Sequence, residues 1–302
     1  MAHRYDAAPP LAFSALEYPG EVEALDVDGV QVAYVDAGPE TADAVVLVHG
    51  LGENIGFWEL NMLPLSRHRR VVAVDLPGYG RSDKPEMAFT MAYYADVVEA
   101  VLAHLNIRRA VLVGHSMGGQ VVLTSALRHP ERVAGLILAA PAGIETFDAG
   151  EAAFLKGAVS TDIYMGQTED QIRSNYRNNL FFAWKPAYET QVKQRVQLGR
   201  SPEFKAYAWA VVQGIYAMLD GPVFDRLGEV QVPVLVMFGH QDALIPNPLL
   251  HGGEARSVGK AAIAALPHAE LVMIDAAGHM LQFEQPERFN AEVLRWLEAQ
   301  GL

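Results

Sequence analysis

Short apolar segments rich in β-branched residues recur along the chain and alternate with segments whose apolar residues have helical spacing. Continuously apolar runs of this kind are typical of strands that are covered on both faces, as in a parallel sheet. The alternation of strands and helices predicts an α/β fold, a three-layer sandwich with right-handed crossovers. The expected strands are 44–48, 71–74, 110–113, 133–138, 232–238 and 271–274, and the clearest helices are 91–105, 118–128 and 286–298.

The segments 21–27 and 30–35 differ from these runs, because apolar and polar residues alternate in them. Such alternation is typical of half-buried strands. The residues between them, Asp28-Gly29, are a two-residue hairpin signal, so we expect these segments to form a β-hairpin.

A long segment between the strands ending near 140 and beginning near 232 has no convincing buried strand. We expect a helical cap over residues 144–222, inserted into a core made of 1–143 and 223–302. Its aromatic residues either form the core of the cap or line the roof of a pocket at the carboxyl edge of the sheet, where open α/β sheets bind ligands. The expected cap helices are 149–159, 169–179, 187–198 and 203–219, and the aromatic residues include Phe181, Phe182, Trp184, Tyr207 and Trp209.

The composition narrows the function classes. The 302 residues fit one large domain or a domain with an insertion. With 23 Lys and Arg against 36 Asp and Glu, the net charge of −13 disfavours nucleic acids and anionic membranes as partners. The absence of cysteine excludes disulfides, thiolate chemistry and cysteine-ligated metals.

We expect neither a membrane span nor a signal peptide. No run approaches the roughly 18 apolar residues that a membrane span requires. The segment 1–20 has charged residues and prolines where a signal peptide has its apolar core. The expected location is therefore the cytoplasm.

The segment 111–119 reads Val-Leu-Val-Gly-His-Ser-Met-Gly-Gly and contains G-x-S-x-G between a predicted strand and a predicted helix. That context is the one in which a nucleophilic serine sits on a sharp turn. Gly114 and Gly118 relieve the crowding around Ser116, and the N-terminal N–H groups of the following helix stabilise a developing oxyanion. Ser116 is therefore the predicted nucleophile.

A serine nucleophile needs a histidine base, and the base needs a carboxylate that fixes its tautomer. His279 follows the last predicted strand, and Asp242 follows the strand 232–238, so both belong to the same edge of the sheet as Ser116. Asp75 also ends a strand, but it lies in the turn-like stretch Asp75-Leu-Pro-Gly-Tyr-Gly, and we interpret it as structural.

Two backbone N–H groups are expected to form the oxyanion hole. One belongs to Met117, which follows the nucleophile. The second comes from the glycine-rich loop 49–53, with Leu51 preferred and Gly52 as the alternative, unless this loop is a plain strand-to-helix turn. No metal and no cofactor are expected, because His115 and His240 do not belong to a metal-binding motif.

These motifs together resemble the α/β-hydrolase fold superfamily, in its capped, carboxylesterase-like serine hydrolases, over nearly the whole chain. The resemblance rests on His49-Gly-Leu-Gly52, Asp75-Leu-Pro-Gly-Tyr-Gly-Arg-Ser82, Gly114-His-Ser-Met-Gly118, Asp242 and Gly278-His279. It implies an eight-stranded, mostly parallel sheet with the hairpin as its antiparallel edge, and a triad of Ser116, Asp242 and His279. The chain departs from the family in an added segment at 249–260.

Serine at this position implies acyl transfer, whereas related haloalkane dehalogenases and epoxide hydrolases use aspartate there. The expected function is hydrolysis of small-molecule carboxylic esters with short to medium, uncharged acyl groups through an acyl-enzyme. The alternatives are a carbon–carbon bond hydrolase, a monoacylglycerol lipase, a lactonase or a ligand-binding receptor. A carbon–carbon hydrolase would need basic cap residues, such as Arg173, Arg177 or Lys185, in the pocket. A homodimer through the cap or an edge strand is a further option.

Overall fold

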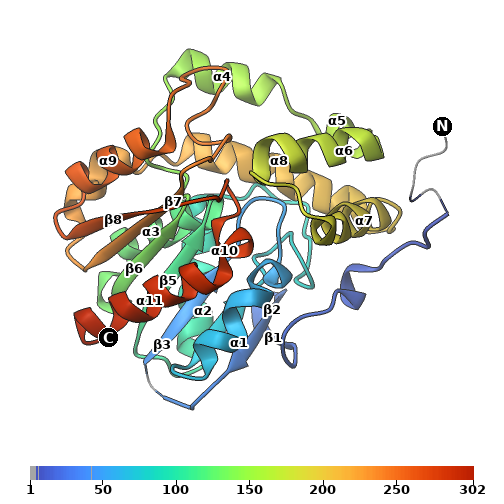
Figure 1. Cartoon of the computed structure of the whole chain (residues 1–302). Helices are drawn as coiled ribbons and strands as arrows, with labels where there is room; N and C mark the ends of the chain where they lie inside the picture. The colour runs from blue at the N-terminus through green and yellow to red at the C-terminus, as the bar shows by residue number, and fades with distance from the viewer. Residues whose placement is uncertain (1–4, 6, 42) are drawn as a thin grey trace.

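An eight-stranded, mostly parallel sheet forms the centre of the protein in this computed structural model (Figure 1). The structure describes residues 5, 7–41 and 43–302, so part of the segment on which the absence of a signal peptide was predicted lies outside the described residues. The strand order is β1-β2-β4-β3-β5-β6-β7-β8. The strands are β1 Glu23–Val27, β2 Val30–Ala37, β3 Asp43–Val48, β4 Val71–Val74, β5 Arg109–His115, β6 Val133–Ala139, β7 Val234–Gly239 and β8 Ala269–Ile274.

The pairing of the strands confirms the expected α/β fold. The hairpin β1–β2 is antiparallel and joins β4 in antiparallel pairing, while all other neighbouring strands are parallel. Asp28 and Gly29 form the hairpin turn with φ values of 52° and 84°, which a two-residue hairpin requires. Every residue of β4 and of β7 is buried, as expected of strands covered on both faces.

Helices cover both faces of the sheet. Helices α1 and α11 pack against each other on one face, and α2 and α3 pack together on the other (Figure 1). Helix α9 contacts β7 and β8. These helices are α1 Glu59–Ser66, α2 Met91–His104, α3 Met117–Arg128, α9 Ala255–Ala265, α10 Leu281–Glu284 and α11 Pro286–Gln300.

The segment that we expect to be a cap consists of helices joined by turns and loops, and it lies above the sheet in the view of Figure 1. The predicted helix 169–179 is an α-helix followed by the π-helical turn Tyr176–Leu180, and one short helix, α5, was not predicted. The added segment 249–260 consists of turns and the first half of α9. The helices of this part are α4 Ala149–Gly157, α5 Thr161–Met165, α6 Glu169–Asn175, α7 Glu189–Leu198 and α8 Phe204–Asp220.

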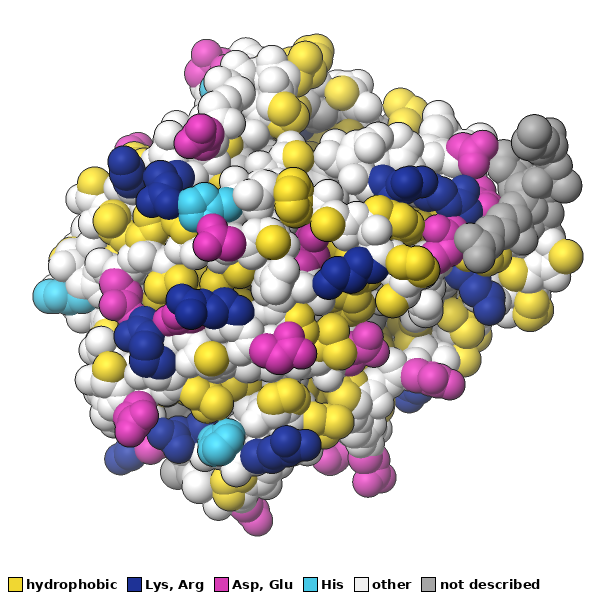
Figure 2. Space-filling view, in the orientation of Figure 1, with side chains coloured by type: hydrophobic (Ala, Val, Ile, Leu, Met, Phe, Trp, Pro, Cys, Tyr) yellow, Lys and Arg dark blue, Asp and Glu magenta, His cyan; other side chains and the backbone are white. Residues whose placement is uncertain are grey.

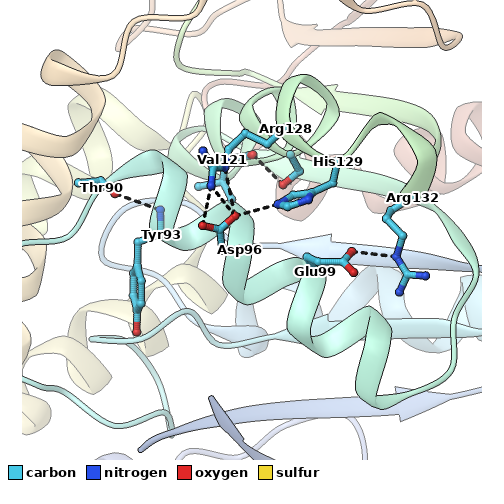
Figure 3. A network of polar contacts seen from close by, with 9 residues as sticks. Thr90, Tyr93, Asp96, Glu99, Val121, Arg128, His129 and Arg132 are labelled. Atoms are coloured by element: carbon cyan, nitrogen blue, oxygen red, sulfur yellow. Dashed lines mark hydrogen bonds and ion pairs between the residues drawn. The ribbon is translucent and has the colours of Figure 1, made fainter. Parts of the chain in front are cut away.

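A surface network of ion pairs joins α2 to the end of α3 (Figure 3). Asp96 accepts hydrogen bonds from Arg128 at 2.7 Å and from His129 Nε2 at 2.8 Å. Glu99 accepts from Arg132 at 2.8 Å in the same region. Arg128 is the last residue of α3, whereas Ser116 precedes its first residue, so this network lies at the end of α3 opposite to Ser116.

On the face shown in Figure 2, Lys and Arg side chains of the described residues are scattered among acidic ones. Within the described part of the chain, no helix is long and apolar enough to cross a lipid bilayer.

Candidate active site

Ser116 lies at the sharp turn between β5 and α3 and has φ 52° and ψ −117°. This positive φ is strained for a residue with a side chain. The residues two positions before and after Ser116 must be glycine. A Cβ at Gly114 would lie 2.2 Å from the carbonyl oxygen of Gly118, and a Cβ at Gly118 would lie 2.3 Å from the carbonyl oxygen of Val48. The structure thus has the local geometry that the sequence motif predicts for a nucleophile turn.

Asp242 and His279 meet at the same edge of the sheet. His279 Nδ1 lies 2.9 Å from Asp242 Oδ2, and both side chains are buried. The other oxygen of Asp242 accepts hydrogen bonds from the N–H groups of Leu244 at 2.8 Å and Ile245 at 3.0 Å. The carboxylate is therefore held on both sides and fixes the orientation of the imidazole ring.

A cavity of about 510 Å³ is lined by several of the predicted residues, but Met117 and Asp242 are not among its lining residues. Ser116, His279, Leu51 and Gly52 all line it. Its floor consists of the loops at the carboxyl ends of the strands, and its roof consists of the helical segment 144–222. Ser116 and His279 share this space without a hydrogen bond between their side chains in the described structure, a common situation in ligand-free sites.

The glycine-rich loop offers a free donor at the expected position. The N–H of Gly50 is occupied by Glu53 Oε2 at 2.8 Å, whereas the N–H of Leu51 has no acceptor among the described residues. Met117 is the first residue of α3, so its N–H has no partner within the helix. Gly52 adopts φ 74° and its carbonyl accepts from Tyr207 at 2.6 Å, which holds the loop against α8.

A buried ion pair supports this floor. His115 Nδ1 lies 2.9 Å from Glu53 Oε1, and His115 Nε2 donates to the backbone carbonyl of His279 at 3.0 Å. Burial opposes both charges, but the carboxylate of Glu53 outweighs it and raises the pKa of His115, while His115 lowers the pKa of Glu53. Because Glu53 also binds the N–H of Gly50, the pair connects the Leu51 loop with the His279 loop.

A second carboxylate connects the His279 loop with the roof. Glu284 accepts from the N–H of Gly278 at 2.6 Å and from the N–H of Phe182 at 2.9 Å. The N–H of Met280 donates to the carbonyl of Leu180 at 3.2 Å. The backbone on either side of His279 is therefore tied to the same short segment of the roof.

Asp75 takes no part in this cavity. Its carboxylate is buried and accepts from Tyr18 at 2.7 Å, from the N–H of Ile55 at 2.8 Å and from that of Arg81 at 2.7 Å. Burial raises the pKa of Asp75. These contacts agree with the structural interpretation of this residue.

The aromatic residues of the roof divide between the two expected roles. Phe181 and Trp184 pack with Tyr188 in a small apolar cluster, and Phe182 and Trp209 are exposed. Tyr207 is buried against the Gly52 loop. The aromatic residues of the roof that line the cavity are Phe147, Tyr164 and Tyr176.

Sequence reasoning missed three charged residues of this region: Glu53, Glu284 and Arg195. Arg173, Arg177 and Lys185, the basic residues named for a carbon–carbon hydrolase, do not line the cavity. Another arginine of the roof, Arg195, lines it, so the cavity contains the kind of basic residue that this alternative needs. The signal for Arg195 is present in the sequence, because it shares the buried face of α7 with Val192 and Leu198 at a spacing of three residues. An arginine in such a stripe indicates a cation that faces the protein interior.

The described residues contain no group of three or more His, Asp or Glu side chains arranged to hold a metal ion.

Comparisons with known proteins identify the family of the chain. The family model of the alpha/beta hydrolase fold matches residues 43–286. The dihydrolipoyllysine-residue acetyltransferase component of the acetoin cleaving system of Pseudomonas putida is 32% identical over 272 residues, which cover 90% of this chain and 68% of that protein. The chain thus spans about two thirds of the length of that relative.

Two solved structures have the same fold. A probable hydrolytic enzyme from Pseudomonas aeruginosa PAO1 superposes with a TM-score of 0.84 at 26% identity, covering 95% of this chain and 98% of that one. A thermophilic esterase from Thermogutta terrifontis superposes with a TM-score of 0.74 at 25% identity, covering 93% of this chain and 99% of that one. The sheet, the match to the family model and these relatives show that the chain belongs to the alpha/beta hydrolase fold family.

Proposed function

We propose that the protein is a serine hydrolase that cleaves carboxylic esters with short to medium, uncharged acyl groups. The observation that carries this proposal is that His279, which is bonded to Asp242, lines the same cavity as the strained Ser116. The similarity to a solved esterase supports the same reaction class.

The proposed reaction has two halves. Ser116 Oγ attacks the ester carbonyl while His279 Nε2 takes the hydroxyl proton, and Asp242 stabilises the resulting imidazolium. The N–H groups of Leu51 and Met117 stabilise the oxyanion of the tetrahedral intermediate. The alcohol leaves with the proton from His279, and water then attacks the acyl-enzyme with His279 again as the base. The acid is released and Ser116 is regenerated.

The cavity supports the proposed substrate size. Its volume is about 510 Å³, and apolar side chains of α8 such as Val211 and Ile215 form part of its wall. A cavity of this size encloses a small-molecule ester.

A series of p-nitrophenyl esters from acetate to decanoate tests the proposal, with Ser116→Ala as the paired variant. We expect steady turnover that is highest for short to medium chains and falls by about 10⁴- to 10⁶-fold in Ser116→Ala, since the triad acts as a unit. Acylation of Ser116 by a p-nitrophenyl ester without steady turnover would instead support a ligand-binding receptor.

The alternatives use the same three residues, so the panel includes their substrates: a vinylogous diketone, a monoacylglycerol and a lactone. The proposal fails if any of these is turned over with a kcat/KM well above that of the best simple ester.

A further inference from the structure

Most of the charged side chains that line the cavity have a partner of opposite charge, but one does not. Glu53 is paired with His115, and His279 with Asp242. Glu145, at the start of the roof, lies 2.5 Å from His251 Nδ1 and also accepts from the N–H of Asn247 at 2.7 Å. Arg195 is the remaining charged residue of the lining, and it has no carboxylate partner among the described residues.

The guanidinium of Arg195 is held by neutral groups. Its Nη2 donates to the carbonyl of Tyr164 and to Gln167 Oε1, both at the long distance of 3.3 Å. The rings of Tyr164 and Phe204 lie 4.5 and 4.4 Å from its central carbon. The Nε and Nη1 groups have no acceptor in the described structure, although the residue is only 7% exposed.

A buried cation without an anionic partner is costly, because water is removed and no opposite charge replaces it. The two aromatic rings recover part of this cost and fix the plane of the guanidinium. The unused Nε–H and Nη1–H groups point to different edges of the guanidinium, and each can donate a charge-assisted hydrogen bond to a carboxylate. Arg195 is therefore oriented and desolvated, but its charge is not neutralised.

Another arginine of the same helical segment shows how a structural arginine is satisfied here. Arg173 lies 2.5 Å from Glu169, 3.2 Å from Asp170 and 2.8 Å from Glu189. Its charge is compensated within the roof, and it does not line the cavity. The different surroundings of Arg195 indicate a role toward a molecule in the cavity.

We propose that Arg195 binds a carboxylate of the substrate. This inference rests on the proposed function and narrows it: since the acyl group is uncharged, the carboxylate belongs to the alcohol part of the ester. The substrate class is then an ester of an uncharged short or medium acid with a hydroxy acid.

The test compares 4-(butyryloxy)benzoate with its neutral amide, 4-(butyryloxy)benzamide, in the wild type and in Arg195→Gln, Arg195→Lys and Arg177→Gln. Arg177 is the matched control, because it is an exposed arginine of the roof that packs over Trp184 outside the cavity. We expect the wild type to favour the carboxylate in kcat/KM by about 10- to 100-fold, the range of a charge-assisted hydrogen bond. The preference should disappear in Arg195→Gln, fall several-fold in Arg195→Lys and persist in Arg177→Gln.

The ratio of the two substrates separates recognition from folding. A merely structural Arg195 would lower the turnover of both esters equally and leave their ratio unchanged, which would overturn the proposal. A wild type without preference for the carboxylate would overturn it as well. Preference for monoesters of dicarboxylic acids that is lost in Arg195→Gln would support Arg195 as the carboxylate site but reject the uncharged acyl group.

A binding measurement separates this inference from the proposed reaction. Calorimetry with the Ser116→Ala protein measures the affinity of the same two esters without turnover. Tighter binding of the carboxylate, by the same factor and dependent on Arg195, supports the site even if the wild type hydrolyses neither ester. Equal affinities in this protein reject the site even if the wild type is an active esterase.

Discussion

The floor and the roof of the cavity differ in how they treat buried charge. In the floor, His279 is paired with Asp242 and His115 with Glu53, so each ionisable group has its partner within the protein. In the roof, Arg195 reaches the cavity without such a partner. Under the proposed roles of these residues, the catalytic groups are organised before a ligand enters, whereas the recognition site is completed only by the charge of the ligand.

The loops of the floor have a further property. They are connected to one another through buried polar contacts, with Glu53 binding the Leu51 loop and its partner His115 binding the backbone of His279. Displacement of one loop therefore disturbs the others. Precise placement of reacting groups is a large part of catalysis, and small displacements have large effects on rate.

The largest loss of activity is expected from Asp242→Asn, which removes the carboxylate partner of His279 in the floor. The amide keeps an oxygen for the N–H groups of Leu244 and Ile245 but presents an N–H group to His279, which forces the ring into the wrong tautomer. We expect kcat to fall by about 10⁴-fold with little change in stability. Ester turnover measures the loss of kcat, and thermal unfolding measures the change in stability. The control is Asp275→Asn, because the side chain of Asp275 is 93% exposed. A fall of less than tenfold would remove Asp242 from the proposed triad.

An intermediate effect is expected from Glu53→Gln, which leaves His115 buried without its anion. We expect the free energy of unfolding to fall by about 3 kcal/mol, as when one charge of a buried pair is removed. Turnover should fall too, since the His279 loop loses support. Chemical denaturation measures the change, and Glu59→Gln, at an exposed position of α1, is the control.

The pH dependence of this difference distinguishes an ion pair from a neutral hydrogen bond. The pKa of Glu53 is lowered from 4.5, so its contribution is present above pH 4.5 and is lost as the pH falls through the lowered value. The pKa of His115 is raised from 6.5, so its contribution is complete below pH 6.5 and is lost as the pH rises through the raised value. The stability difference between wild type and Glu53→Gln should therefore be greatest between pH 4.5 and 6.5. A difference that does not vary with pH would contradict the ion pair.

The smallest change in stability is expected from His251→Gln, which removes a contact between the core and the roof. His251 lies 2.5 Å from Glu145 and 3.2 Å from Glu151, and the hydrogen bond to Glu145 raises its pKa above 6.5. Its contribution is present below pH 6.5 and is lost as the pH rises through the raised value. The side chain is partly exposed, so we expect only about 0.2–1 kcal/mol at pH 6 and less at higher pH. Thermal unfolding at several pH values measures this change, with His268→Gln, at an exposed position, as the control. An equal loss of stability in both variants would show that the contacts of His251 with Glu145 and Glu151 contribute nothing.

Local features explain why much of the floor could be predicted. The strands are apolar over their whole length because both faces of the sheet are covered, and the turn at Ser116 needs glycine on both sides for steric reasons. The positions of Asp242 and His279 follow from the rule that parallel strands end at one edge. Predicted and observed strand bounds accordingly differ by at most two residues at each end of the six parallel strands.

The roof was less predictable, because its function depends on how amphipathic helices dock. The sequence indicated helices and aromatic residues there, but Tyr164 and Tyr176 line the cavity whereas Phe181 and Trp184 pack away from it. Helical periodicity identifies a buried face; it does not say whether that face meets another helix or an open cavity.

The sequence by itself determined the sheet, the nucleophile turn and the identity of the residues at its edge, since these follow from local sterics and from the burial of apolar strands. Only the tertiary structure decided that Glu53 pairs with His115, which is 62 residues away, and that Arg195 faces the cavity without a partner. Both depend on distances between segments far apart in the chain. Local sequence preferences depend only on residues that are near in the chain, whereas the energy of a buried charge depends on the groups that surround it in space.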